Sequence, residues 1–82
     1  MEKSEIKLQL QTLVRNFIGR PNHELKEGQQ IDDYIQSPVQ LTFSAAIAFK
    51  FKKVDATDLA NSIGDMETFK ELINYIYEAY EI

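Results

Sequence analysis

The chain has 82 residues, 44% of them hydrophobic, with a formal net charge of −4 and no cysteine. A chain of this length supports one hydrophobic core, so residues 1–82 are predicted to form a single domain. The absence of cysteine excludes disulfides, thiolate metal sites and cysteine nucleophiles. No stretch approaches the roughly 20 apolar residues of a membrane-spanning helix, and the first residues lack a signal-peptide core. A cytoplasmic protein with no membrane span is therefore expected.

Charge is unevenly distributed along the chain. Eight basic and six acidic residues precede Asp55, whereas from Asp55 onward there are seven acidic residues and only one basic residue, Lys70. The net acidity argues against nucleic acid as a partner, because phosphates attract basic surfaces. A nucleic-acid-binding role would depend on Lys50, Lys52 and Lys53 alone.

The first regular element is a helix predicted over residues 4–18. Its apolar residues recur at steps of three and four and therefore share one face. Ser4 is expected to cap the helix start, and Gly19 is expected to end the helix in the left-handed conformation. The apolar positions are Ile6, Leu10, Leu13, Val14 and Phe17.

Residues 19–36 form a long connection, which is unusual in a compact domain unless it is packed or functional. Four apolar residues are expected to hold this loop against the core. His23 lies in the loop without a cysteine or a second histidine nearby, so we expect a surface role for it. The loop anchors are Leu25, Ile31, Tyr34 and Ile35.

Residues 39–51 alternate apolar and other positions like a strand, but their length favours a helix. As one strand they would extend about 43 Å, whereas as a helix they span about 20 Å. Pro38 suits the first helical position after a Ser37 cap. The alternative is an α+β domain with a hairpin over residues 39–54. Wound as a helix, the segment is apolar nearly all round, so it either lies centrally or presents an apolar surface to a partner, including a second copy.

Two further helices complete the chain. A short one is predicted over residues 55–62, capped by Asp55, and Ile63 to Met66 should form a turn. The last helix begins near Thr68, which stands at capping-box spacing from Glu71. This order of elements predicts an all-α fold, a small antiparallel four-helix bundle with a long first loop and a short third helix. The apolar stripe of the last helix is Phe69, Leu72, Ile73, Ile76 and Tyr80.

Several of these residues together resemble the acyl carrier proteins, the family that binds phosphopantetheine. Ser37 opens an apolar helix, Phe51 ends it, and the closing helix reads Thr-Phe-x-x-Leu-Ile-x-Tyr-Ile from position 68. The resemblance extends from the long loop through the last helix. It implies an acyl-carrier-like fold in which Ser37 bears a covalent 4′-phosphopantetheine arm.

The resemblance also implies a function and partners. The protein would be a small discrete acyl or aminoacyl carrier, a phosphoprotein holding its cargo as a thioester for fatty acid, polyketide or related lipid metabolism. Its partners would be a phosphopantetheinyl transferase and acyl-transferring or synthase enzymes. It would not be an enzyme itself, because no nucleophile–base pair or glycine-rich phosphate loop is evident.

The sequence departs from the family pattern around Ser37. Where the family shows Asp-Ser-Leu, this chain has Gln36, Ser37 and Pro38, and no acid occurs from Ser37 to Val54. Without the family resemblance, capping of the helix alone would be enough to explain a serine at position 37. The alternative function is therefore a degenerate carrier-like bundle without a prosthetic group, which acts as a protein–protein interaction module and possibly self-associates through residues 39–51.

Overall fold

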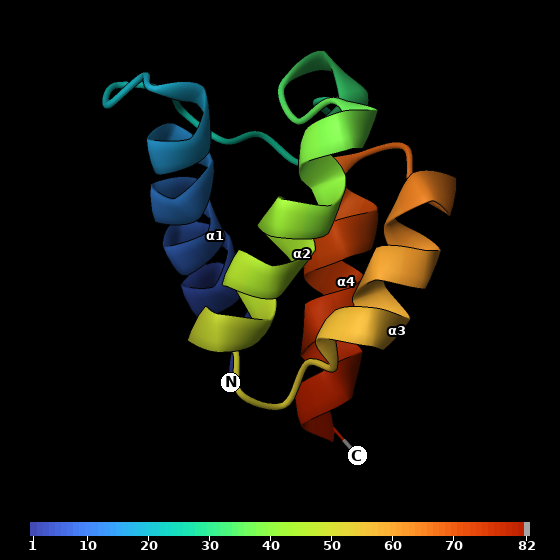
Figure 1. The fold of residues 1–82 in the computed structure, drawn as a ribbon. Helices are drawn as coiled ribbons and strands as arrows, with labels where there is room; N and C mark the ends of the chain where they lie inside the picture. The colour runs from blue at the N-terminus through green and yellow to red at the C-terminus, as the bar shows by residue number, and fades with distance from the viewer. Residues whose placement is uncertain (82) are drawn as a thin grey trace.

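A computed structural model describes residues 1–81, and these residues are mainly helical (Figure 1). The chain forms α1 (Lys3–Ile18), α2 (Ser37–Lys50), α3 (Ala56–Ser62) and α4 (Phe69–Glu81). Two single turns of 3₁₀ helix, η1 (Ile31–Asp33) and η2 (Ile63–Asp65), precede α2 and α4. The prediction of an all-α fold is confirmed, and the hairpin alternative is wrong because α2 occupies that segment. None of the helices in residues 1–81 combines the length and apolarity needed to cross a bilayer.

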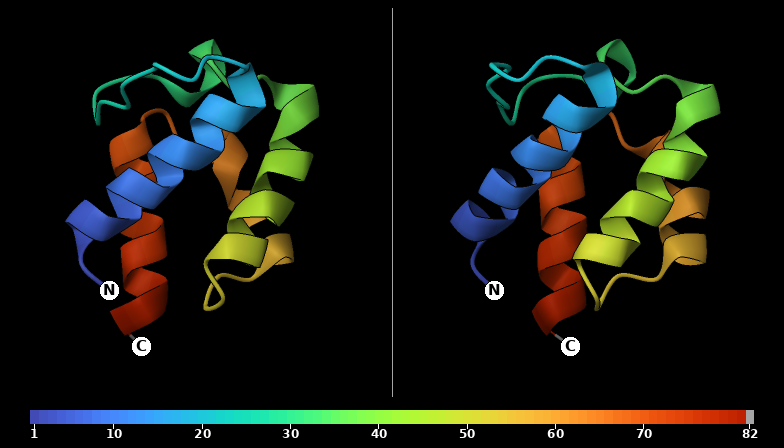
Figure 2. Two further views of the ribbon diagram at one scale, coloured as in Figure 1. Left: turned by 90° about the vertical axis from the view of Figure 1, so that its left-hand side faces the viewer. Right: turned by 60° about the vertical axis from the view of Figure 1, so that its left-hand side comes forward.

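The four helices alternate in direction. In Figure 1, α1 and α3 run upward and α2 and α4 run downward. Helix α1 packs against α4, and α2 packs against α3. The two ends of the described chain lie at the same end of the molecule, as Figure 2 shows from two further directions. The long loop crosses the opposite end, where α2 begins.

The core lies between the helices and under the long loop. Helix α1 contributes Ile6, Leu10 and Val14, all fully buried, as its apolar periodicity predicts. The ring of Phe17 meets Phe43 of α2 edge to face, with the ring centroids 5.1 Å apart, a favourable aromatic geometry. Helix α3 adds Leu59, and helices α2 and α4 add Phe43, Ile47, Phe69, Leu72, Ile73 and Ile76.

Both ends of α1 illustrate which local signals are reliable. Gly19 adopts φ = 68° and its N–H donates to the Arg15 carbonyl, so the predicted left-handed end is confirmed. The predicted cap at Ser4 is wrong. The helix begins at Lys3 because the extended Glu2 already offers its carbonyl to the Ile6 N–H at 3.0 Å. Ser4 therefore lies inside the first turn.

The start of α2 is also one residue earlier than predicted. Ser37 is the first helical residue and Gln36 occupies the capping position, without a capping hydrogen bond from its side chain. The Gln36 carbonyl accepts from the Val39 N–H at 2.8 Å, which closes the first turn around Ser37. Because Ser37 itself lies within the helix, the prediction that it is the cap is wrong.

The long loop caps the start of α4 with its backbone. The N–H groups of Phe69 and Lys70, which have no partner within their own helix, donate to the carbonyls of Gln29 and Glu27 at 3.1 and 3.0 Å. The Ile31 N–H donates in return to the Glu67 carbonyl at 2.9 Å. The loop anchors Leu25, Ile31 and Ile35 are buried as predicted, and Tyr34 is half-buried.

Of the capping box predicted at the start of α4, the structure of residues 1–81 shows only the glutamate bond, shifted by one residue. The Glu71 carboxylate accepts from the backbone N–H of Glu67 at 2.5 Å, one residue before the expected Thr68. The Thr68 carbonyl accepts from the Glu71 and Leu72 N–H groups. Helix α3 matches its prediction, since the Asp55 carboxylate accepts from the N–H groups of Thr57 and Asp58 at 2.9 and 3.0 Å.

Candidate functional site

Ser37 lies at an exposed junction between the long loop and α2. Its neighbours Gln36, Pro38 and Val39 are exposed as well, so no large side chain of this segment covers the hydroxyl. The helix start carries the positive end of the helix dipole, which favours a nearby negative group such as a phosphate. The site therefore offers an accessible hydroxyl in surroundings that tolerate an anionic substituent.

A buried glutamine holds the turn that bears Ser37. The Gln40 side chain, only 6% exposed, donates from Nε2 to Asp32 Oδ1 at 2.7 Å and to the Ile35 carbonyl at 3.1 Å. These bonds join η1 to the first turn of α2 on both sides of Ser37. Gln40 was not among the residues predicted from the sequence. Its spacing of three and seven residues before Phe43 and Ile47, both buried, is the signal that could have found it.

The acidic residues before Ser37 do not form a metal centre. Asp32 and Asp33 are both exposed, and the Asp32 carboxylate is already used by Gln40. Among residues 1–81, no group of three or more histidine, cysteine or acidic side chains could hold a metal ion.

His23 is part of the packing of the long loop. Its ring lies 4.7 Å from the Tyr34 ring between centroids, and Nε2 lies 3.3 Å from Gln29 Oε1. The His23 carbonyl accepts from Arg15 Nε at 2.6 Å. The imidazole is half-buried among these groups, so it lies in the loop framework instead of on an open surface.

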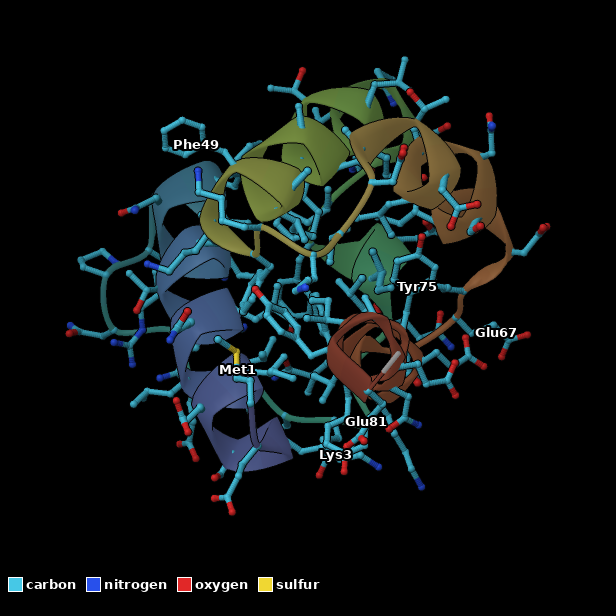
Figure 3. The ribbon with its side chains drawn as sticks, turned by 90° about the horizontal axis from the view of Figure 1, so that it is seen from below. Met1, Lys3, Phe49, Glu67, Tyr75 and Glu81 are labelled. Carbon is cyan, nitrogen blue, oxygen red and sulfur yellow. The ribbon has the colours of Figure 1, made fainter. Side chains whose placement is uncertain are left out.

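Helix α2 divides its apolar residues between the core and the surface. Ile47 of α2 and Phe51 after its end are buried, whereas Leu41 is 66% exposed. Phe49 is 77% exposed and projects from the end of α2 (Figure 3). In exchange, the inward face carries the polar residues Gln40 and Ser44. Within residues 1–81, the buried Ser44 hydroxyl has no hydrogen-bond partner.

A second polar feature joins α3 to α4. The Tyr75 hydroxyl donates to Asp58 Oδ2, and burial, this hydrogen bond and the charge of Asp58 raise the pKa of Tyr75 to about 12. The pair borders an open groove of about 620 Å³. A tyrosine with this pKa remains a hydrogen-bond donor at neutral pH and does not act as a base. The groove is lined by Lys53, Val54, Asp55, Asp58, Tyr75, Glu78 and Ala79.

Among these features, Ser37 is the one that combines exposure with a held backbone. The buried Gln40 holds the turn through its bonds to Asp32 and to the Ile35 carbonyl, and the Ser37 hydroxyl remains open to a partner. Comparisons with protein-family models, curated proteins and solved structures found no match to this chain.

Proposed function

We propose that the protein is a small carrier protein that holds an acyl or aminoacyl group as a thioester on a 4′-phosphopantetheine arm attached to Ser37. The observation that supports this most directly is the exposed Ser37 hydroxyl at the first residue of α2. The order of elements also supports it: helix, long loop, helix, short helix and helix, alternating in direction as in an antiparallel carrier-like bundle.

The surroundings of Ser37 fit such an arm. The hydroxyl is exposed, and the helix start favours the phosphate that would join the arm to it. The arm would supply a thiol, on which cargo is held as a thioester. The chain itself would supply a hydroxyl at a fixed position, kept there by Gln40 and its bonds to Asp32 and Ile35. All bond making would belong to the transferase and to the acyl-transferring or synthase partners.

The composition of α2 bears on those partners. The helix has no acidic residue and is followed by Lys52 and Lys53, with Lys50 in its last turn. Opposite charges favour association and like charges oppose it. We therefore expect partner enzymes to meet α2 through acidic or apolar surfaces and not through basic ones.

Mass spectrometry of the intact protein tests the proposal. Coexpression with a broad-specificity phosphopantetheinyl transferase should add the mass of one phosphopantetheine group to the wild-type chain and nothing to Ser37→Ala. Ser44→Ala is the matched control, because Ser44 lies in the same helix but is fully buried. It should be modified like the wild type. An unmodified wild-type chain, or an equal addition to Ser37→Ala, would contradict the proposal.

The second candidate function is a carrier-like bundle that has no prosthetic group and acts as an interaction module. The observation in its favour is the exposed apolar surface of α2, above all Leu41 and Phe49. The replacement of the family's Asp-Ser-Leu by Gln36, Ser37 and Pro38 is consistent with it. An unmodified wild-type chain in the mass experiment would favour this function over the first.

A further inference from the structure

The outward face of α2 carries a narrow apolar stripe. It consists of Leu41, Ala45 and Phe49, which are spaced four residues apart and therefore lie on one side of the helix. Leu41 is 66% and Phe49 77% exposed, and Ala45 between them is exposed as well. Within residues 1–81, no helix covers this stripe, since its three residues remain exposed although α1 and α3 pack against α2.

The stripe is symmetric about its midpoint. A large apolar side chain lies one turn before Ala45 and another lies one turn after it, with a small side chain between them. A small residue at the crossing point lets two helices approach closely, and larger residues on either side then fill the space around it. When two such stripes meet in antiparallel directions, Leu41 of each copy faces Phe49 of the other.

The charges near the two ends of α2 are opposite. Lys50, Lys52 and Lys53 lie at its C-terminal end, and the Lys52 Nζ is 4.4 Å from the centroid of the Phe49 ring. Asp32 and Asp33 are exposed residues of η1, which lies before the N-terminal end of α2. Antiparallel pairing brings the lysines of one copy toward the aspartates of the other.

We propose that this face of α2 binds a second copy of the chain in an antiparallel, two-fold symmetric pair whose axis passes near Ala45. Such an interface is isologous, so each copy contributes the same residues and each contact occurs twice. The proposal gives the interaction-module alternative a specific partner, and it does not depend on modification of Ser37. The two hypotheses therefore have separate experimental outcomes.

The size of the stripe sets the expected strength. Stable interfaces bury about 800 Å² on each partner, and one three-turn stripe on a chain with a total surface of 5124 Å² offers less than that. We therefore expect a weak dimer with a dissociation constant between about 10 μM and about 1 mM. Its charged ends should make the association weaker at high salt.

Sedimentation equilibrium of the unmodified full chain across that concentration range tests the pairing. The wild type should change from monomer to dimer, and Phe49→Ser should weaken the association by about tenfold or more, because it removes the largest apolar group of the interface. Leu8→Ser is the matched control, since Leu8 is 64% exposed on α1, and it should associate like the wild type. A wild type that stays monomeric throughout, or an equal loss for the two variants, would overturn the proposal.

A charge exchange tests the antiparallel direction. Lys52→Glu and Asp33→Lys should each weaken the dimer, because each places like charges opposite one another. Combining them in one chain should restore the association, since the opposite charges then meet again with exchanged signs. If the double variant instead lost as much association free energy as the two single variants together, the antiparallel arrangement would be ruled out.

A disulfide provides an independent measurement of the axis. The chain contains no cysteine, so Ala45→Cys introduces a single thiol. Near a two-fold axis the two Cα atoms can come within the roughly 4.4–6.8 Å that a disulfide requires, and oxidation should give a covalent dimer. Oxidation of Leu8→Cys should give little covalent dimer. Equal cross-linking of both variants would contradict the proposed axis, whatever the mass measurement shows for Ser37.

Discussion

At the scale of single residues, Tyr75 makes a contribution to the folding stability that is lost at strongly alkaline pH. Its hydroxyl donates to Asp58, and its pKa is raised to about 12 from an ordinary value of 10.0. Because the pKa is higher in the folded state than in the unfolded state, the stabilisation is complete below pH 10 and is lost as the pH rises toward about 12. This interaction links α3 to α4, which are adjacent in the sequence.

We predict that Tyr75→Phe lowers the free energy of unfolding by about 1 kcal/mol at neutral pH, the usual net value of one hydrogen bond. The difference between wild type and variant should shrink as the pH increases from 10 to about 12. Urea unfolding at a series of pH values measures it. Asp58→Asn removes the charged acceptor and should reproduce much of the effect, so the double variant should lose less than the sum of the two. A difference that stays constant with pH would contradict the assignment.

At the scale of elements, the long loop serves as the cap of α4. Its carbonyls at positions 27 and 29 accept the first free N–H groups of that helix. The side chain of Gln29 holds the loop in this shape: its Oε1 accepts from the Lys26 N–H at 3.2 Å and its Nε2 donates to the Glu24 carbonyl at 3.1 Å. A loop of this length is thus kept in place by hydrogen bonds as well as by its buried apolar residues.

Gln29→Ala should therefore weaken the start of α4 as well as the loop. We predict a loss of about 1 kcal/mol in the free energy of unfolding and faster hydrogen exchange of the Phe69 and Lys70 amides, which donate to the loop. The neighbouring Gln30 has an exposed side chain, so Gln30→Ala serves as the control and should leave both amides protected. Unchanged exchange in Gln29→Ala would show that its side chain does not hold the loop.

At the scale of the whole molecule, a single core connects all four helices and the loop. Phe43 is, like Phe51 and Phe69, fully buried in this core, and it contacts Phe17 of α1. Large-to-small substitutions of buried phenylalanine cost about 3–5 kcal/mol. Domains as a rule have only about 5–15 kcal/mol of stability in total. A large fraction of the stability of this small protein therefore depends on this one side chain.

We predict that Phe43→Ala lowers the free energy of unfolding by about 3–5 kcal/mol, while Phe49→Ala, in the same helix but 77% exposed, changes it by less than about 0.5 kcal/mol. Chemical denaturation at low protein concentration measures both without a contribution from association. Equal losses in the two variants would mean that the assigned orientation of α2 is wrong.

Local sequence signals located most of the elements of this protein. The periodicity of residues 4–18 predicted α1, the glycine at position 19 predicted its end, and Asp55 predicted the start of α3. These features depend on neighbouring residues only, so the sequence contains all the information they need. The first residues of α1 and α2 were each placed one position too late, because a preceding extended residue supplied the first carbonyl in place of a serine cap.

The orientation of α2 was decided by tertiary structure alone. Its apolar residues lie nearly all round the helix, so the sequence by itself determined that the segment is helical and apolar but not which side is buried. The contacts with α1, α3 and the long loop turned Phe43 and Ile47 inward together with the polar Gln40 and Ser44. Leu41 and Phe49 were left on the surface as a consequence. The physical reason is that burial is shared among neighbouring elements, and no local pattern encodes how they divide it.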